Sequence, residues 1–165
     1  MSRHQLTAVQ EDYLEIIYRL QTIGESDEVR VSDIASRLGT KLPTVTRTVR
    51  RLSNLGLLHH ALRGRVTLTV SGHRMAVEIV HRHQDVLTLF TDILGLDPAQ
   101  AEGDVCSIEH GISAATAQRL HEFLEHFAAL PRPVQIRLTS FGRSKGRASA
   151  SFSSLTKSRV NGWRT

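Results

Sequence analysis

Cysteine is almost missing from this sequence of 165 residues, which contains only Cys106. A lone cysteine cannot form a disulfide within its own chain, so the sequence excludes a disulfide-stapled secreted domain. Long uninterrupted apolar runs are missing too, and the segment from Met1 to Asp12 lacks the apolar core of a secretory signal. We therefore expect a cytoplasmic protein with no membrane partner.

Acidic side chains are also missing from whole stretches of the chain. Residues 131–165 contain 8 basic residues and no acidic one, and residues 30–74 contain 9 basic residues and 1 acidic one. In contrast, residues 1–29 have 2 basic and 6 acidic residues, and residues 75–130 have 2 basic and 9 acidic residues. This alternation favours one segment that meets a polyanion and another that collects cations.

The first half of the chain predicts short helices followed by a hairpin. Thr7 and Gln10 form a capping-box pattern before a helix that reaches about Ile23. A second helix is predicted over residues 33–38, capped by Ser32 and ended by Gly39. A third helix is predicted from Pro43 to Asn54, then two strands over residues 57–62 and 65–69 around the tight turn Arg63-Gly64. This order is typical of a winged helix-turn-helix.

The helix from Pro43 to Asn54 combines an apolar stripe with an unusually basic outer face. A solvated surface is the ordinary interpretation of such a face, but here it coincides with a predicted wing and a strongly basic segment. We therefore predict DNA binding, in which arginines contact phosphates and guanine edges and wing residues reach the flanking backbone. The candidate DNA-binding residues are Thr44, Thr46, Arg47, Arg50, Arg51, Arg63 and Arg65.

A thiol, a carboxylate and an imidazole lie within five residues at Cys106, Glu109 and His110. Residues three and four apart share one face of a helix, so these side chains would form a three-point site for a divalent cation. An ordinary polar surface turn remains the alternative. Further ligands would have to come from elsewhere in the chain.

The second half of the chain predicts helices only, up to a basic tail. A long helix should run from Ser71-Gly72 to near Leu94, Asp97-Pro98 should open the next, and Ser113 should cap another. Pro131 and Pro133 then break the helical pattern, and residues 142–165 are predicted to be disordered. The apolar stripe of the long helix is predicted as Ala76, Val80, His83, Leu87, Phe90 and Leu94. A histidine in such a stripe is more often a core residue than a ligand, although the site at Cys106 needs partners.

Four patches of sequence together resemble the diphtheria toxin repressor family of metal-dependent regulators. They are Asp12-Tyr-Leu-Glu15, Pro43-Thr-Val-Thr-Arg47, Arg82-His83 and Cys106-Ser-Ile-Glu109-His110. The resemblance covers roughly residues 6–130, and its specificity lies in the order and spacing of the patches. The architecture is similar to that of the shorter manganese transport regulators.

The resemblance implies a mostly α-helical protein with an N-terminal winged helix-turn-helix and an all-helical dimerisation domain. The expected divisions are a DNA-binding domain over residues 1–71, a metal-binding and dimerisation domain over residues 72–141, and the tail. It implies a homodimer that represses transcription at a palindromic DNA operator, with Arg47 facing bases. The implied metal ligands are Asp12, Glu15, His83, Cys106, Glu109 and His110.

The ligand set departs from both branches of that family. Manganese-type members have glutamate in place of Cys106, and iron-type members have methionine in place of Asp12. A thiolate favours iron, cobalt or zinc, whereas carboxylates suit manganese or iron. We therefore expect Mn²⁺ or Fe²⁺, with Zn²⁺ or Co²⁺ ranked after them.

Two other functions are compatible with the same residues. One is a zinc-dependent hydrolytic enzyme with Glu109 as general base, although the sequence contains no His-Glu-x-x-His pairing. The other is a metal-independent winged-helix regulator that senses oxidation at Cys106. Metal content of the purified protein separates these alternatives from the metal-dependent repressor, which we predict to have no catalytic residues.

Overall fold

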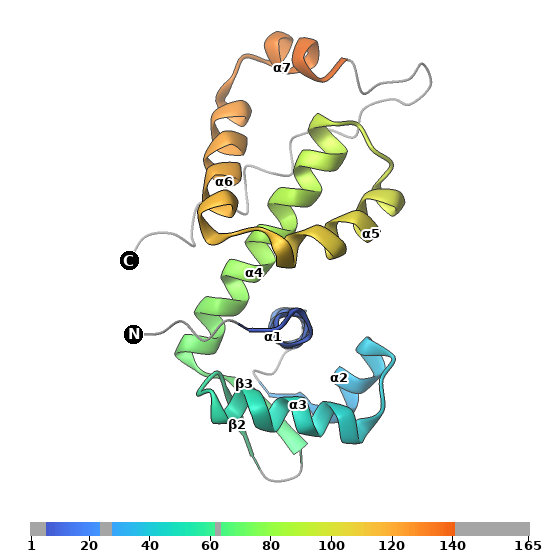
Figure 1. The fold of residues 1–165 in the computed structure, drawn as a ribbon, viewed down its shortest axis with the longest axis vertical. Helices are drawn as coiled ribbons and strands as arrows, with labels where there is room; N and C mark the ends of the chain where they lie inside the picture. Colours follow the sequence, from blue (N-terminus) through green and yellow to red (C-terminus); the bar gives the residue numbers. More distant parts are fainter. Residues whose placement is uncertain (1–5, 24–27, 62–63, 141–165) are drawn as a thin grey trace. The chain divides into compact units, whose positions relative to one another are not determined.

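The computed structural model describes residues 6–23, 28–61 and 64–140. Within these ranges, helices predominate and three short strands form one sheet (Figure 1). The chain divides into two compact units, and the boundary falls between Gln84 and Asp85, inside the helix α4. The predicted fold class, a winged helix-turn-helix followed by a helical domain, is confirmed. The predicted domain divisions stay a prediction.

Helix α1 spans Ala8–Ile23 and begins at the predicted capping box. The backbone N–H of Thr7 donates to Oε1 of Gln10 at 3.0 Å, and the N–H of Gln10 donates to Oγ1 of Thr7 at 3.4 Å. These bonds satisfy donors that a helix N-terminus otherwise leaves open. The apolar face of α1 fully buries Leu14 and Ile17, so this helix is part of the core of the first unit.

Helices α2, Val31–Leu38, and α3, Leu42–Asn54, follow with a short turn between them. Gly39 ends α2 as predicted, with a left-handed φ of 61° that glycine adopts without strain. The predicted start of α2 is wrong. Ser32 lies inside the helix because the extended backbone already ends at Arg30, whose side chain makes no capping bond.

The sheet has the order β1-β3-β2, with both pairs antiparallel. Strands β2, Leu58–His60, and β3, Arg65–Leu68, form the predicted hairpin. Gly64, before β3, has a φ of 71°, as the predicted tight turn requires. The two-residue strand β1, Val29–Arg30, is not predicted by the sequence because it is too short to show alternation. Arg63 lies outside the described residues.

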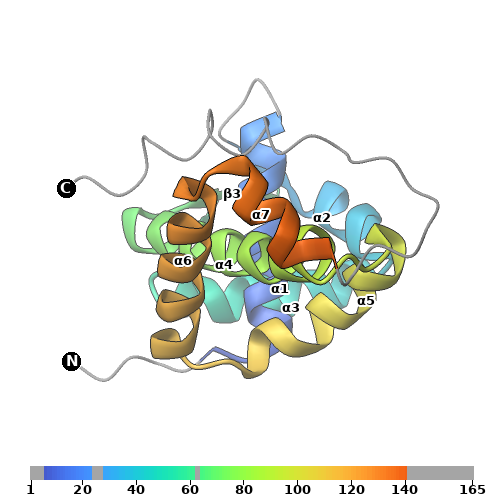
Figure 2. The same cartoon turned by 90° about the horizontal axis from the view of Figure 1, so that it is seen from above.

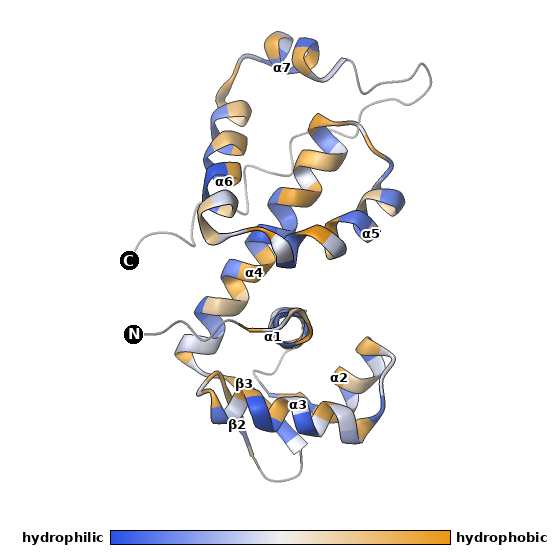
Figure 3. Cartoon of the chain, viewed as in Figure 1, coloured by the Kyte–Doolittle hydropathy of each residue, from blue (hydrophilic) through white to orange (hydrophobic). Residues whose placement is uncertain are grey.

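One apolar core joins these helices and strands. On α3, the fully buried residues follow the predicted helical spacing, which leaves the opposite face of this helix hydrophilic (Figure 3). The completely buried apolar side chains of the first unit include Leu14, Ile17, Ile34, Val45, Val49, Leu52 and Val66. This core holds α3 against α1 and the hairpin.

Helix α4, Val70–Thr88, continues directly into the π-helical turn η2, Leu89–Ile93. At its start, the helix passes very close to the hairpin, because a Cβ added to Gly72 would lie 1.9 Å from the carbonyl oxygen of Leu57. The N–H of Gly72 also donates a hydrogen bond to Oγ1 of Thr69 at 3.0 Å. Glycine is therefore required at residue 72 by space rather than by backbone angles.

The apolar stripe predicted for this long helix is displaced by one residue at three positions. The structure buries Ile79, Val86 and Ile93, whereas the prediction assigned the stripe to residues 80, 87 and 94. Each pair consists of two adjacent apolar residues, so helical spacing alone could not distinguish them. Ala76 and His83 are buried as predicted.

The second unit contains helices α5, Pro98–Ile108, and α6, Ala114–Ala129, joined through the 3-10 turn η3, Glu109–Gly111. The predicted cap of α6 is present, since the N–H of Thr116 donates to Oγ of Ser113 at 3.1 Å. Of the large apolar side chains on α6, Leu124 and Phe127 are buried with Ile93, while Phe123 is exposed and Leu120 is partly buried.

A further helix, α7, spans Arg132–Thr139, where the sequence predicted only a break (Figure 2). Pro133 lies in its first turn, a position at which the missing N–H costs nothing. The side chain of Gln135 points inward and donates to the carbonyl oxygens of Ala128 at 3.2 Å and Leu130 at 2.8 Å. These bonds satisfy carbonyls at the end of α6.

None of the described helices combines the length and apolar character needed to cross a membrane. Residues 142–165, predicted from the sequence to be a basic disordered tail, lie outside the described residues.

Candidate metal centre and nucleic-acid surface

Helix α5 carries the cysteine of the predicted metal site. It starts as predicted, because the side chain of Asp97 accepts a hydrogen bond from the N–H of Ala99 at 3.0 Å and Pro98 occupies the first turn. Val105 is fully buried and anchors the helix. The next residue, Cys106, is exposed.

The α-helix ends just after Cys106, and Glu109 and His110 lie in the 3-10 turn η3. A 3-10 helix has three residues per turn, which keeps residues three apart on one side. Glu109 is 1% exposed. The Nε2 of His110 lies 3.7 Å from Oε1 of Glu109. Of the three side chains predicted to share a face, Cys106 and Glu109 therefore have donor atoms close together, and His110 is not in that group.

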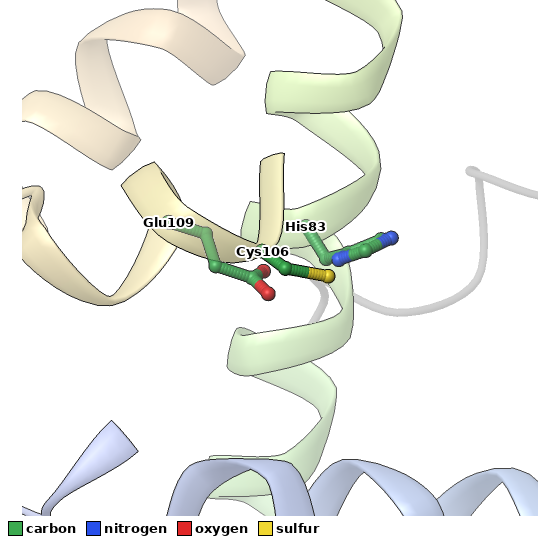
Figure 4. Close-up of side chains that lie close together, drawn as sticks. All are labelled: His83, Cys106 and Glu109. Carbon is green, nitrogen blue, oxygen red and sulfur yellow. The ribbon is translucent and has the colours of Figure 1, made fainter. Parts of the chain in front are cut away.

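His83 completes a group of three possible metal ligands. One donor atom each from His83, Cys106 and Glu109 lies within 4.8 Å of the other two (Figure 4). His83 is 5% exposed and belongs to α4, the helix that carries the chain into the second unit. Among the described residues, no other three His, Cys, Asp or Glu side chains have donor atoms within 4.8 Å of one another.

The chemistry of this group fits a divalent transition metal. An imidazole nitrogen, a thiolate sulfur and a carboxylate oxygen are all first-row metal ligands, and the mixture is borderline rather than purely soft or hard. A carboxylate as buried as that of Glu109 is costly unless it is paired, hydrogen-bonded or bound to a cation. Three donors also leave room for further ligands.

The remaining predicted ligands lie outside this group of three. Asp12 and Glu15 are on α1, three residues apart and hence on one face, and both are partly buried. Oε1 of Glu15 pairs with Nη2 of Arg19 at 2.6 Å. His110 lies beside Glu109 as described above. The structure thus brings together three of the six predicted ligands.

Helix α3 presents most of the predicted DNA-binding residues on its outer face. Thr44, Arg47, Arg50 and Arg51 are exposed, and Thr46 is partly buried with its hydroxyl donating to the carbonyl of Leu42 at 2.9 Å. Leu42, Pro43, Thr46, Arg47 and Arg50 line a shallow cavity of about 490 Å³. This face has the arginines and hydroxyls that contact phosphates and base edges.

A larger groove of about 740 Å³ lies between α2, the start of α3 and the hairpin. Its lining includes Arg65, as predicted, but also Arg30, Leu42 and His60, which the sequence analysis missed. Arg30 could not be found because β1 is too short to be recognised, and Leu42 is 52% exposed where an apolar residue would be expected to be buried. Arg65 forms an ion pair with Glu28, so part of its charge is already compensated.

The comparisons with known proteins identify both halves of the chain. Residues 5–66 match the family described as iron dependent repressor, N-terminal DNA binding domain. Residues 69–136 match the iron dependent repressor, metal binding and dimerisation domain. Two families that occur in this order match most of the chain.

Individual relatives agree with these matches. The chain is 35% identical over 119 residues to the transcriptional regulator MntR of Escherichia coli O6:H1, covering 72% of this chain and 75% of that protein. It is 38% identical over 122 residues to the HTH-type transcriptional regulator MntR of Shouchella clausii, covering 73% and 82%.

Among solved structures, a manganese-dependent transcriptional repressor in complex with manganese superposes with a TM-score of 0.62 at 31% identity. The match covers 70% of this chain and 52% of the other, so the chain spans about half the length of that repressor.

Proposed function

The chain belongs to the iron-dependent repressor family, the diphtheria toxin repressor family of metal-dependent regulators, and on that premise we propose that it is a metal-activated repressor of transcription. In this proposal, a cytoplasmic homodimer binds a palindromic DNA operator when a divalent cation is bound, and it controls metal-ion homeostasis. The observation that carries the proposal is the convergence of His83, Cys106 and Glu109 in a chain whose first part matches a DNA-binding domain.

We propose that Asp12, Glu15 and His110 complete the ligand set of His83, Cys106 and Glu109. The proposal is supported by the placement of Asp12 and Glu15 on one face of α1 and by the 3.7 Å approach of His110 to Glu109. Three carboxylates favour Mn²⁺ or Fe²⁺, while the thiolate admits Zn²⁺ or Co²⁺, which we rank after them. When bound, the cation would supply positive charge that compensates the clustered carboxylates.

The acidic segments account for why the protein would respond to metal. Residues 1–29 and 75–130 carry net charges of −4 and −7, so their carboxylates repel each other when no cation compensates them. A bound cation would attract the ligands of α1 and those of residues 83–110 to the same position, because its positive charge compensates their carboxylates. A conformation of the dimer that binds the operator is thereby favoured, because a ligand shifts an equilibrium toward the state that it binds more tightly.

The DNA side of the proposal rests on α3 and the hairpin. Thr44, Thr46, Arg47, Arg50 and Arg51 would enter the major groove or contact its phosphates, with Arg47 reading bases, and Arg65 and Arg63 would reach the flanking backbone. Arg30 and His60 line the same groove as Arg65, so we add them as phosphate contacts. A second copy of the chain would place its own α3 on the other half of a palindrome.

The family match favours this function over the two alternatives. A hydrolytic zinc site would keep an open coordination position for a reacting water, whereas the proposed set has enough ligands to fill the coordination sphere. A regulator that ignores metal would have no need to bury Glu109 beside a thiol and an imidazole. We therefore propose no enzymatic activity.

The test is to select binding sequences from a pool of random duplexes with the full chain in the presence of Mn²⁺. Affinity for the selected duplex is then measured in buffered Mn²⁺, Fe²⁺, Co²⁺ and Zn²⁺ and with a chelator. We expect tight, sequence-specific binding with metal and its loss with chelator, and loss of the metal response in Glu109→Gln. Equal binding with and without metal would contradict the proposal.

A further inference from the structure

A partly buried ion pair links α1 to α4 within the first unit. The Nη2 of Arg82 donates to Oε2 of Glu11, and the two side chains are 17% and 18% exposed. The residues are 71 positions apart in the sequence, so the pair joins two separate elements. By comparison, the local pair between Arg119 and Glu122 on α6 is 85% and 47% exposed.

Each partner of this pair is the immediate neighbour of a proposed metal ligand. Glu11 precedes Asp12 on α1, and Arg82 precedes His83 on α4. In a helix, each residue is rotated by a fixed angle and raised by about 1.5 Å from the one before it. A contact between Glu11 and Arg82 therefore restricts how α1 and α4 can shift relative to each other, and with them Asp12 and His83. Glu15 follows Asp12 by three residues on the same helix.

From this arrangement we infer that Arg82 and Glu11 are positioning residues for the metal site, which hold α1 in register with α4 so that the α1 carboxylates stand correctly relative to His83. The inference rests on the proposed function. Neither residue has to contact the metal. Their contribution is to reduce the rearrangement that metal binding would otherwise require.

The energetics of the pair favour a geometric role over simple stabilisation. Nε of Arg82 is buried and has no hydrogen-bond partner within the described part of the chain, which is a cost that an apolar side chain would not incur. Buried ion pairs can often be replaced as a whole by well-packed apolar residues with no loss of stability, whereas removal of one partner alone is destabilising. The bond from Nη2 of Arg82 to Oε2 of Glu11 is charge-assisted and directional, so it ties the carboxylate to one position on the planar guanidinium.

Substitutions of Arg82 and Glu11 distinguish a positioning role of the pair from a direct effect of its charges on metal affinity. If the pair acted only through its charges, Arg82→Met would remove a cation near the ligands and tighten metal binding, while Glu11→Gln would remove an anion and weaken it. Positioning predicts that both variants weaken it. Arg82→Lys sharpens the comparison because it keeps the charge but replaces the planar guanidinium by a compact ammonium on a different stem, so the donor no longer lies where Nη2 does. Only positioning predicts a loss for this variant.

The experiment measures Mn²⁺ affinity of the full chain from the electron paramagnetic resonance signal of free Mn²⁺, together with urea unfolding in the absence of metal. We expect Arg82→Met, Arg82→Lys and Glu11→Gln each to weaken Mn²⁺ binding by about tenfold or more, as is typical when residues that orient ligands are changed. The reversed pair, Glu11→Arg with Arg82→Glu, should recover most of this loss. The matched control, Arg119→Met, should bind Mn²⁺ as the unaltered chain does.

Several outcomes would overturn the inference. They are tighter binding in Arg82→Met, unchanged binding in Arg82→Lys and Glu11→Gln, or no recovery in the reversed pair when that variant is folded. The unaltered chain and Glu109→Gln are measured alongside. If the unaltered chain binds Mn²⁺ and Glu109→Gln does not, unchanged pair variants reject the positioning role alone. If the unaltered chain binds no Mn²⁺, the positioning role and its premise of Mn²⁺ binding both fail.

Discussion

The sulfur atom of Cys106 should determine which divalent metal the site prefers. The thiolate is a soft ligand among carboxylates and imidazole, and replacing it by glutamate keeps a negative charge while making the donor hard. We predict that Cys106→Glu remains activated by metal but shifts its preference toward Mn²⁺ and away from Zn²⁺. Cys106→Ala should lose its response to all metals. Operator binding against buffered free metal is the measurement.

An unchanged order of metals in Cys106→Glu would remove Cys106 from the set of ligands. Ser107→Ala is a suitable control, because Ser107 is the exposed neighbour of Cys106 and its hydroxyl donates to the carbonyl of Gly103 within the same helix. That variant should keep the original order.

Arg47 and Arg65 should differ in what they contribute to DNA binding. Arg47 is exposed on α3, and we predict that Arg47→Ala reduces discrimination at one or two base pairs by about 1 to 3 kcal/mol, the usual value of a bidentate guanine contact. Arg65→Ala, on the wing, should weaken all duplexes alike, and only slightly because Glu28 already pairs with it. Binding to the selected operator and to single-base variants of it distinguishes the two. Equal losses on every duplex for Arg47→Ala would reject base reading.

At the scale of elements, the approach of α4 to the hairpin sets a limit on the side chain at residue 72. We predict that Gly72→Ala lowers the free energy of unfolding by about 1 to 3 kcal/mol, because the added methyl group meets the backbone carbonyl of Leu57 and the backbone must shift. Gly103→Ala, on α5, is the matched control. A Cβ there meets nothing within 4 Å, so this variant should gain about 0.5 to 1 kcal/mol from the higher helix propensity of alanine. Urea unfolding of both variants checks the difference, and a neutral Gly72→Ala would show that the hairpin yields.

Elements whose ends are set by local hydrogen bonds could be predicted from the sequence. The Thr7–Gln10 box, the Asp97 and Ser113 caps and the left-handed Gly39 all act within a few residues, and each is present. Elements set by distant partners could not. Strand β1 exists because it pairs with β3, and α7 is held by Gln135, whose amide reaches carbonyls of α6 that no local pattern reveals.

The candidate site divides in the same way. Cys106 and Glu109 are close in the sequence, so their shared face followed from helical geometry. His83 is 23 residues earlier than Cys106, and its interpretation as a ligand depended on the family resemblance, because its place in an apolar stripe favoured a core role. The ion pair of Arg82 with Glu11 joins residues 71 positions apart, and nothing in the spacing of either helix predicted it.

For the whole molecule, a metal that tightens DNA binding must itself be bound more tightly when DNA is present. We predict that saturating operator lowers the dissociation constant for Mn²⁺ by the same factor by which Mn²⁺ lowers that for operator, about 5 to 150-fold for typical coupling free energies. The check is Mn²⁺ titration with and without operator, with a scrambled duplex as control. Unequal factors would mean that a third equilibrium, such as dimerisation, is coupled to both.

The boundary inside α4 also determines where this chain can be divided for use in fusion proteins. A cut between Gln84 and Asp85 would place His83 on one fragment and Cys106 and Glu109 on the other, so neither piece would inherit the three donors. A cut just before Val70, where α4 begins, keeps all three on the C-terminal piece and leaves the helix-turn-helix and hairpin on the N-terminal piece. Even that C-terminal piece lacks Asp12 and Glu15 of α1, the carboxylates that we propose to complete the ligand set, so neither junction should transfer the full metal response to a fusion protein.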